Sequence, residues 1–221
     1  MKDKLVVNEI FGSIDGEGVR TGELATFIRL AGCNLRCSYC DTDYSLTIKD
    51  GKEMSISEIL DKVKEIGYKN ITLTGGEPLI HKNVEQLIDT LIENGYKVNI
   101  ETNGAVDITK YTSKNVLLTM DYKTNSSGMM KYMLNKNIAL LREYDVFKIV
   151  CSKNDFDDIK EILKNNDIKS YIYLSPIFNE VEPYELVEFL KELNKEGFNT
   201  SKIRIQIQLH KIIWEPNKRG V

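Results

Sequence analysis

Three cysteines, Cys33, Cys37 and Cys40, lie within eight positions of this chain and could bind metal through their thiolates. Their C-x3-C-x2-C spacing has no adjacent fourth ligand, although a structural zinc site usually has four Cys or His ligands. Three thiolates suit an iron–sulfur cluster with one iron left open, and an open metal position can bind a reactant. Zinc stays an alternative if a distant residue completes the site, and the candidates are Cys151, His81 and His210.

The composition limits the class of protein that carries these thiols. The chain has 221 residues, 42% of them hydrophobic, which suits one domain spanning residues 1–221 with a buried core. With 30 Lys and Arg against 33 Asp and Glu, the net charge of −3 argues against a nucleic-acid partner. No apolar run approaches the ~18 residues of a membrane span, and "MKDKLVVNEIFGS" lacks the apolar segment of a secretion signal. We therefore expect a cytoplasmic protein with reduced cysteines and no membrane partner.

Short β-branched runs alternate with segments of helical period, as parallel βαβ units require. The predicted strands are Glu23–Ala31, Asn70–Thr74, Lys97–Glu101, Asn115–Asp121, Asp145–Val150 and Ser170–Ser175, followed by an alternating edge strand, Lys202–Leu209. The predicted helices are Ser55–Gly67, Asn83–Glu93, Gly128–Glu143, Phe156–Asn165 and Glu182–Glu196. Ser55 and Glu58 form a capping-box pattern that marks the start of the first helix.

This order predicts an α/β fold, an incomplete TIM-type βα barrel with about six parallel strands and a C-terminal edge strand. A doubly wound sheet is the alternative. Active sites of βα barrels form from the loops at the C-terminal ends of the strands. Here those loops hold the three cysteines, "TGGEP" (Thr74–Pro78), "ETNG" (Glu101–Gly104), "DYK" (Asp121–Lys123) and "SP" (Ser175–Pro176). We expect the active site at this edge of the sheet.

The cysteine spacing resembles that of the radical S-adenosylmethionine superfamily, and "TGGEP" resembles that superfamily's contact to the amino group of adenosylmethionine. The resemblance implies a 4Fe–4S cluster whose open iron chelates adenosylmethionine. One electron from the cluster then breaks a carbon–sulfur bond and yields a 5′-deoxyadenosyl radical. Glycine permits close backbone approach, so Gly75 and Gly76 are candidates for this contact, with a simple turn as the alternative.

The remaining motifs resemble the 7-carboxy-7-deazaguanine synthase family nearly from end to end. They are "NEIFGSIDGEG" (Asn8–Gly18), "TFIRLAGCNLRCSYCDT" (Thr26–Thr42), "ETNG", "DYKTNSSGM" (Asp121–Met129), "LSP" and "QLHKIIW" (Gln208–Trp214). The resemblance implies a lyase of queuosine biosynthesis, which converts 6-carboxy-5,6,7,8-tetrahydropterin to 7-carboxy-7-deazaguanine with loss of ammonia. It also implies catalytic use of adenosylmethionine, Mg²⁺, a homodimer, and an electron donor such as a flavodoxin or ferredoxin.

The resemblance further assigns candidate residues to the substrate. Glu17 would accept from the guanidine-like edge of the pterin, and Asp15 stands beside it where the family often has Gln. Arg29, on an apolar strand, would bind the substrate carboxylate, with an internal salt bridge as the equal alternative. His210 and the C-terminal carboxylate of Val221 would also contact the substrate, although a structural histidine and a frayed terminus are the general expectation.

The cofactor side has its own candidates. Thr42 resembles the family's Mg²⁺ ligand, and a local turn cap is the alternative. The candidates for adenosylmethionine binding are Gly75, Gly76, Glu77, Glu101, Asn103 and Ser127, of which the last four could instead be loop or cap residues. Cys151 is interpreted as a small buried residue. Asn125 stands where the family has Pro, which indicates a local change of loop.

Two other functions stay open from sequence alone. A radical activase that abstracts hydrogen from the glycine of a partner enzyme, such as anaerobic ribonucleotide reductase, shares the size and the cysteine spacing. It would not require the set formed by Glu17, Arg29 and His210. The second is a small zinc- or iron–sulfur-binding module without catalysis. Metal content after anaerobic purification separates this module from an enzyme.

Overall fold

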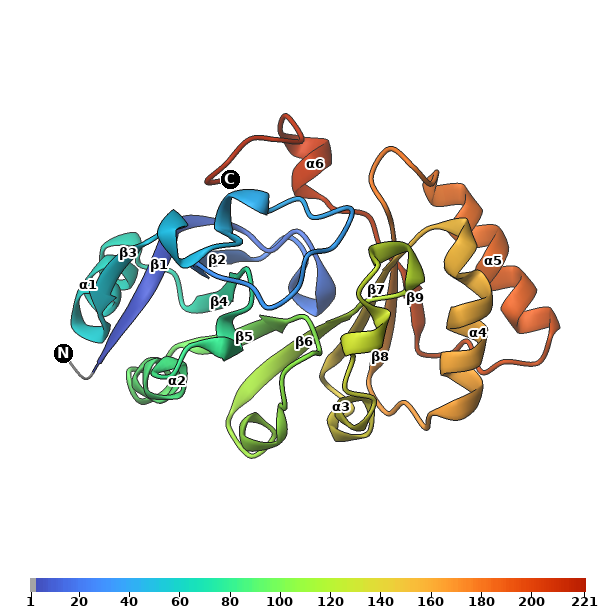
Figure 1. The fold of residues 1–221 in the computed structure, drawn as a ribbon, viewed down its shortest axis with the longest axis horizontal. Helices are drawn as coiled ribbons and strands as arrows, with labels where there is room; N and C mark the ends of the chain where they lie inside the picture. Colours follow the sequence, from blue (N-terminus) through green and yellow to red (C-terminus); the bar gives the residue numbers. More distant parts are fainter. Residues whose placement is uncertain (1–2) are drawn as a thin grey trace.

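The computed structural model describes residues 3–221, which contain one nine-stranded sheet (Figure 1). The strand order is β3-β1-β2-β4-β5-β6-β7-β8-β9, and all neighbours from β2 to β9 are parallel. The strands are β1 (Lys4–Ile14), β2 (Leu24–Leu30), β3 (Lys52–Ser55), β4 (Asn70–Gly75), β5 (Lys97–Thr102), β6 (Val116–Tyr122), β7 (Val146–Cys151), β8 (Tyr171–Pro176) and β9 (Ile203–Ile205). The partial barrel is confirmed. The doubly wound alternative is wrong because the parallel strands follow chain order without a reversal point.

The helices cover the outer side of the curved sheet. They are α1 (Ile56–Ile66), α2 (Val84–Glu93), α3 (Lys136–Leu140), α4 (Phe156–Asn165), α5 (Pro183–Lys195) and α6 (His210–Ile213). Figure 1 shows α1 to α5 along that outer side, whereas α6 and the C-terminus lie over the loop that follows β2. The capping box of α1 is formed, since Ser55 and Glu58 each accept a backbone N–H from the other's residue. Within residues 3–221, no helix combines the length and the apolarity that spanning a membrane would need.

The predicted C-terminal strand, Lys202–Leu209, is correct only in its first part. Ile203–Ile205 pairs with β8 at the edge of the sheet, and the chain then leaves. Gln206 turns inward instead, because its side-chain oxygen accepts the N–H of Gly18 at 2.7 Å. The N–H of Leu209 donates to the carbonyl of Gly16 at 3.1 Å. These contacts bring the segment after β9 back across the loop that follows β1.

The predicted helix Gly128–Glu143 is wrong. Only Lys136–Leu140 is α-helical, and Met130–Tyr132 forms a 3-10 turn. Hydrogen bonds to the neighbouring loop replace those of a continuous helix. The Leu134 N–H donates to the Gly104 carbonyl at 3.2 Å, and the Asn137 side chain donates to the same carbonyl at 3.0 Å. Tertiary contacts therefore outweigh the local helical pattern here.

Two strands were not expected. β1 pairs antiparallel with β2, so the "DGEG" motif, Asp15–Gly18, follows the end of β1 that pairs with the start of β2, opposite to the end from which the cysteine loop leaves. β3 is a short edge strand on β1. Most side chains of β1 are only partly buried and follow no clean alternation, so the sequence carried little signal for it.

Candidate active site

A cavity of about 520 Å³ opens at the C-terminal edge of the parallel strands. The loops after β2, β4, β5 and β6 all contribute to it, as barrel geometry predicts. Residues from β1 and from the segment after β9 close its other sides. The lining includes Glu17, Arg29, Cys33, Cys37, Cys40, Thr42, Gly75, Gly76, Glu101, Asn103, Asp121, Lys123, Lys148, His210, Lys211 and Val221. Widely separated motifs of the sequence thus meet in one place.

The loop after β2 presents all three clustered thiols to the cavity. Its backbone is held by neighbouring loops, since the Cys33 N–H donates to the Leu46 carbonyl at 3.0 Å and the Ser38 N–H to Ser127 at 3.1 Å. Burial raises the pKa of all three thiols, that of Cys37 to about 11. A thiol must lose its proton to bind metal, and a raised pKa makes this loss more costly. Metal binding here must therefore supply the free energy of deprotonation.

Gly75 and Gly76 support this loop through close backbone contact. A Cβ on Gly75, whose φ is +149°, would lie 2.1 Å from the carbonyl oxygen of Leu30. A Cβ on Gly76 would lie 2.4 Å from the carbonyl oxygen of Gly32 and 2.8 Å from the Cβ of Cys33. Glycine is therefore required here to seat the end of β4 directly against the cysteine loop.

Replacing Gly75 with alanine should destabilise the protein by about 3 kcal/mol or more, because the methyl group overlaps backbone that cannot yield. The matched control is Gly95→Ala, which has a positive φ of +77° but open space around it, and should cost about 1–2 kcal/mol. Chemical denaturation of both variants measures the difference. Equal losses of stability would contradict the role of backbone contact.

Charged side chains form the floor of the cavity. Lys148 donates to Glu17 Oε2 at 2.7 Å and also lies 3.4 Å from Asp121 Oδ2. Lys123 pairs with the same Asp121 oxygen at 3.1 Å. Burial raises the pKa of Glu101 to about 7, although Lys148 opposes this, and its carboxyl accepts from Thr74 at 2.8 Å. The floor therefore offers both acceptors and cations to a polar ligand.

Arg29 lies at the side of the cavity and already has a partner. Its Nε donates to Glu9 Oε1 at 2.8 Å, and Tyr44 donates to the same oxygen at 3.2 Å. The internal salt bridge that the sequence left open is thus present. It occupies only Nε, and within residues 3–221 neither Nη group of Arg29 has a hydrogen bond, so both are available to an anion in the cavity.

The C-terminal segment folds over the same side. Residues 216–221 all line the cavity, and the guanidinium of Arg219 lies 3.7 Å from the centre of the Tyr44 ring. Such a stack of a cation on an aromatic ring contributes about 0.5–2 kcal/mol. It brings the terminal residue Val221 to the cavity wall instead of leaving it frayed.

Helix α6 contributes polar groups beside the cysteine loop. Burial lowers the pKa of His210, which favours the neutral imidazole. Lys211 pairs with Asp41 at 3.0 Å, and the hydroxyl of Thr42 donates to Asp41 Oδ1 at 2.9 Å. Asp41, which follows the last clustered cysteine, therefore links the start of α6 to Thr42.

Comparison with known proteins assigns this arrangement. Residues 27–205 match the family model of the radical SAM superfamily. The 7-carboxy-7-deazaguanine synthase of Clostridium acetobutylicum is 44% identical, with 97% of this chain and 98% of that protein covered. The synthase of Leptospira interrogans is 37% identical over 99% of this chain and 98% of its own. This chain belongs to the 7-carboxy-7-deazaguanine synthase family.

Solved structures agree with membership of the 7-carboxy-7-deazaguanine synthase family. The crystal structure of QueE from Escherichia coli has a TM-score of 0.73 and 25% identity, with 94% of this chain and 95% of that chain covered. The structure of Streptococcus suis SuiB bound to S-adenosylmethionine has a TM-score of 0.56 and 16% identity over 80% of this chain and 48% of that one. The SuiB likeness supports the fold alone.

The residues present fit the cofactors that the superfamily implies, a 4Fe–4S cluster and S-adenosylmethionine. Three thiols face the cavity, whereas the fourth cysteine, Cys151, is fully buried in β7 with its thiol directed to the Ser175 carbonyl. Among residues 3–221, no three His, Cys, Asp or Glu side chains are grouped to hold one metal ion. In a cluster each cysteine binds a different iron, which is a different requirement.

Most of the predicted adenosylmethionine residues reach the cavity, but Glu77 and Ser127 do not line it. Glu77 is fully buried and accepts from the N–H groups of Leu79 and Asn103 at 2.9 and 2.6 Å. Burial raises its pKa to about 7, although these hydrogen bonds oppose the rise. Ser127 is equally buried, and its hydroxyl donates to the Thr124 carbonyl at 2.6 Å. In this structure both act within their loops, the alternative left open from sequence.

Asn103 both lines the cavity and holds its loop by hydrogen bonds. It lines the cavity, and its side-chain amide donates to Asn34 Oδ1 at 2.8 Å and lies 3.8 Å from the sulfur of Cys33. Its own oxygen accepts the N–H of Ala105 at 3.0 Å. The loop after β5 is therefore tied to the cysteine loop through one side chain. The unexpected Asn125 lies outside the cavity and donates to Asp158 at the start of α4.

Among the predicted substrate residues, Asp15 is the one that does not line the cavity. Its side chain is 2% exposed and accepts from the Thr72 hydroxyl at 2.7 Å, inside the sheet. Oδ2 has no hydrogen-bond partner within residues 3–221. Burial raises the pKa of Asp15 from 3.8 to about 6, although the Thr72 hydrogen bond opposes the rise. The residue before Gly16 therefore contributes to the core beneath the site.

This buried acid predicts a pH-dependent stability. Between pH 4 and 6 the folded chain holds a proton on Asp15 that the unfolded chain has lost, so stability should fall as pH rises through this window. The loss corresponds to about 3 kcal/mol. Asp15→Asn removes the titration and keeps an acceptor for Thr72. Urea unfolding at pH 4, 5, 6 and 7 should give a flatter profile for the variant, and parallel profiles would contradict the prediction.

Several residues of the site have no role predicted from the sequence. Lys148 was detectable, because a lysine in the apolar run "DVFKIV" must be paired, by the same logic that singled out Arg29. Tyr44, Glu9 and Arg219 had no such signal. Residues of these types are common at protein surfaces. They become part of the site only because the fold brings β1, the cysteine loop and the C-terminus together.

Proposed function

We propose that this protein is a radical S-adenosylmethionine lyase that converts 6-carboxy-5,6,7,8-tetrahydropterin to 7-carboxy-7-deazaguanine and ammonia, a step of queuosine and 7-deazapurine biosynthesis. The observation that carries this proposal is the meeting of the three clustered cysteines with Glu17, Arg29 and His210 in one cavity. Relatives that carry the synthase name are up to 44% identical over nearly the full chain. The proposed reaction is balanced, since the product and ammonia together contain every atom of the substrate.

The cofactors would bind along the β4 and β5 side of the cavity. Cys33, Cys37 and Cys40 would hold the cluster, and the exposed edge of Gly76 with Asn103 would contact adenosylmethionine. When bound and reduced, these cofactors would supply a carbon radical for reversible abstraction of a hydrogen atom from the substrate. The chain's own part is to place the substrate against them and to exclude water.

The substrate would bind between β1 and α6. Arg29 would use its free Nη groups for the substrate carboxylate, and His210, which also lines the cavity, would contact the substrate as well. Glu17 Oε1, which is buried without a partner among residues 3–221, would accept from the N–H groups of the pterin. The carboxylate of Val221 would contribute to the cavity wall on the side of Arg29, where Arg219 stacks on Tyr44. Charged groups at both ends of the ligand explain why a polar heterocycle suits this cavity.

Mg²⁺ would bind through the hydroxyl of Thr42, which lines the cavity next to the cluster loop. A cation that keeps several waters needs only one protein oxygen, together with oxygens of the substrate. Its chemical role would be to orient the substrate carboxylate. Turnover should fall when Mg²⁺ is removed with EDTA, and this dependence should weaken in Thr42→Ala. Equal rates with and without EDTA would overturn the proposal.

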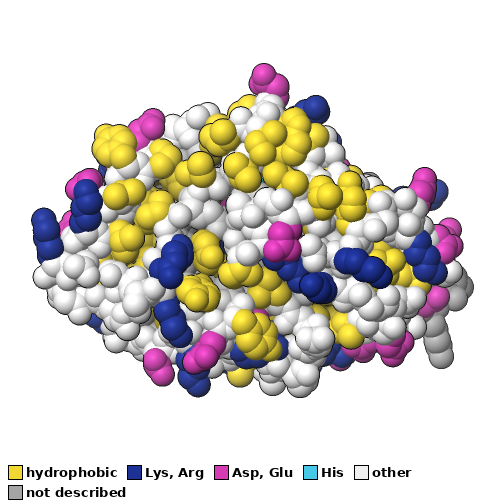
Figure 2. Space-filling view, turned by 180° about the vertical axis from the view of Figure 1, so that it is seen from behind, with side chains coloured by type: hydrophobic (Ala, Val, Ile, Leu, Met, Phe, Trp, Pro, Cys, Tyr) yellow, Lys and Arg dark blue, Asp and Glu magenta, His cyan; other side chains and the backbone are white. Residues whose placement is uncertain are grey.

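The protein partners are also proposals. We infer an electron donor such as a flavodoxin or ferredoxin, and a homodimer. Support for the homodimer comes from exposed hydrophobic side chains of the C-terminal part, Phe178, Tyr184, Val187, Ile207, Ile212 and Ile213. Figure 2 shows hydrophobic side chains spread over the upper part of the face seen from behind. Sedimentation should give a mass of two chains, and a mass of one chain would contradict the dimer.

The experiment that tests the function is a reaction of anaerobically reconstituted protein with reductant, adenosylmethionine, Mg²⁺ and the pterin. We expect ammonia release that depends on the pterin, and a product with the mass of 7-carboxy-7-deazaguanine. If only 5′-deoxyadenosine accumulates, the substrate is wrong and the activase reading gains support. Stoichiometric zinc without iron after anaerobic purification would overturn the radical chemistry altogether.

A further inference from the structure

Lys148 is a buried cation with no role in the function proposed above. It lies in the middle of β7, between the apolar residues Phe147 and Ile149, and its side chain is only 9% exposed. A lysine is rarely buried to this extent unless it is paired. Its ammonium lies at the floor of the cavity, where both of its partners are also lining residues. The position suggests a purpose connected with the site.

Two carboxylates each contact Lys148 through one oxygen and leave the other oxygen without a partner. Nζ lies 2.7 Å from Oε2 of Glu17 and 3.4 Å from Oδ2 of Asp121. The other oxygens, Glu17 Oε1 and Asp121 Oδ1, are buried and have no hydrogen-bond partner among residues 3–221. Asp121 is itself fixed, because it lies opposite Lys148 on the adjacent strand and pairs with Lys123.

Glu17 has no such support of its own. It follows β1 in a loop, and among residues 3–221 its carboxylate has no hydrogen-bond or ion-pair partner besides Lys148. A carboxylate on a loop can rotate unless a hydrogen bond holds one oxygen, and a charge-assisted hydrogen bond is a strong restraint. Without Lys148, Glu17 would also face the carboxyl group of Glu101 without the ammonium that now interacts with both, since Lys123 is already paired with Asp121.

We propose that Lys148 is a positioning residue for the substrate: it holds Glu17 by Oε2 and thereby aims Oε1 at the N–H edge of the heterocycle. This inference rests on the proposed function, in which Glu17 accepts from the pterin. Lys148 itself does not contact the reacting atoms. It acts through Glu17, so its removal weakens recognition of the heterocycle and leaves cleavage of adenosylmethionine intact.

The test is calorimetric titration of 6-carboxypterin, a redox-stable analogue, into reconstituted but unreduced protein with adenosylmethionine. Lys148→Met should weaken binding about tenfold, the value of one hydrogen bond to a charged group. In turnover assays KM should rise similarly while kcat changes less than about twofold. Lys148→Gln, which keeps a donor, should have an affinity between those of the wild type and Lys148→Met. It replaces Lys148→Met in the test if the methionine variant does not fold.

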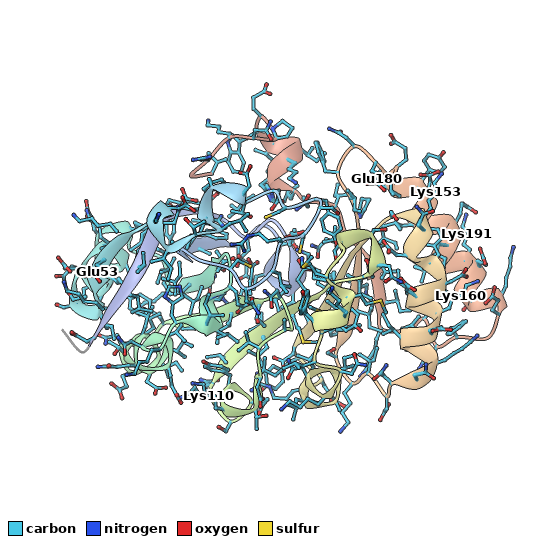
Figure 3. All side chains as sticks on the ribbon, viewed as in Figure 1. Glu53, Lys110, Lys153, Lys160, Glu180 and Lys191 are labelled. Carbon is cyan, nitrogen blue, oxygen red and sulfur yellow. The ribbon has the colours of Figure 1, made fainter. Side chains whose placement is uncertain are left out.

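A double-mutant cycle separates positioning from a structural role. In a Glu17→Gln background, Lys148→Met should change affinity by less than about twofold, since the carboxylate that it holds is already gone. The control is Lys160→Met, which removes a lysine of α4 that pairs with Glu192 and Glu196 and does not line the cavity. Figure 3 shows Lys160 on the outer side of the molecule. This variant should bind 6-carboxypterin like the wild type.

The outcomes distinguish the two proposals. If the wild type neither binds 6-carboxypterin nor converts the tetrahydropterin, the proposed function fails and the role of Lys148 fails with it. If the wild type binds and Lys148→Met binds equally well, only the positioning role is overturned. The same follows if Lys148→Met weakens binding tenfold in both backgrounds, because the lysine would then act independently of Glu17.

Discussion

Replacing Cys37 with alanine is expected to abolish both iron binding and turnover. Cys37, Cys33 and Cys40 are the thiols that face the cavity, and each would bind one iron of the cluster. The buried alternative, Cys151, lies in the core of β7 and cannot replace a lost ligand without unfolding the strand. Iron and sulfide analysis after anaerobic reconstitution, with the visible absorption of the cluster, measures the loss directly.

The matched control is Cys151→Ala, which removes the fourth cysteine. Its loss should lower stability by about 1 kcal/mol through the buried sulfur, with iron content and turnover unchanged. The assignment of the cluster would be contradicted if Cys37→Ala kept a full cluster. It would equally be contradicted if Cys151→Ala lost one, because the fourth position would then be a protein ligand and not the site for adenosylmethionine.

Replacing Arg29 with alanine is expected to lower kcat/KM for the pterin about thirtyfold or more. This corresponds to the ~2 kcal/mol or more that is lost when one member of a desolvated charge pair is removed. Reductive cleavage of adenosylmethionine should continue, because Arg29, with Glu9 and Tyr44, lies on the side of the cavity that we propose for the substrate. Separate quantification of 7-carboxy-7-deazaguanine and 5′-deoxyadenosine measures the two activities in one reaction.

The control for Arg29 is Arg204→Ala, an exposed arginine of the edge strand β9 that stacks on Tyr171. It should change kcat/KM less than twofold. A second readout is needed because Arg29 also pairs with Glu9 inside the protein. If pterin turnover survives in Arg29→Ala while the unfolding midpoint falls, Arg29 has only the structural role and the carboxylate contact is wrong.

The place of the site could be predicted from sequence because parallel strands align their C-terminal ends. Once "TGGEP" and "ETNG" are assigned to strand ends, the sheet brings them together with the cysteine loop whatever the lengths of the helices. The positions of Gly76, Glu101 and Asn103 in the cavity lining follow from that geometry. The capping box of Ser55 could be predicted for a different reason, because its contacts are local.

The rest depended on contacts between distant parts of the chain. No local pattern says that Glu9 of β1 meets Arg29, or that Arg219 stacks on Tyr44, because antiparallel pairing of β1 and the return of the C-terminus create those neighbours. Glu77 shows how neighbours in sequence can differ in environment. Its place beside the glycines favoured a cofactor contact, yet two backbone N–H groups satisfy its carboxylate inside the fold.

We propose above all that a carboxylated pterin binds in this cavity and is the substrate of the adenosylmethionine radical chemistry. The most direct measurement is the molar ratio of 7-carboxy-7-deazaguanine to 5′-deoxyadenosine after anaerobic turnover of 6-carboxytetrahydropterin, read by mass spectrometry. We expect a clear molar excess of product, since the abstracted hydrogen would return and adenosylmethionine would be reused. Accumulation of 5′-deoxyadenosine with no 7-carboxy-7-deazaguanine would contradict it.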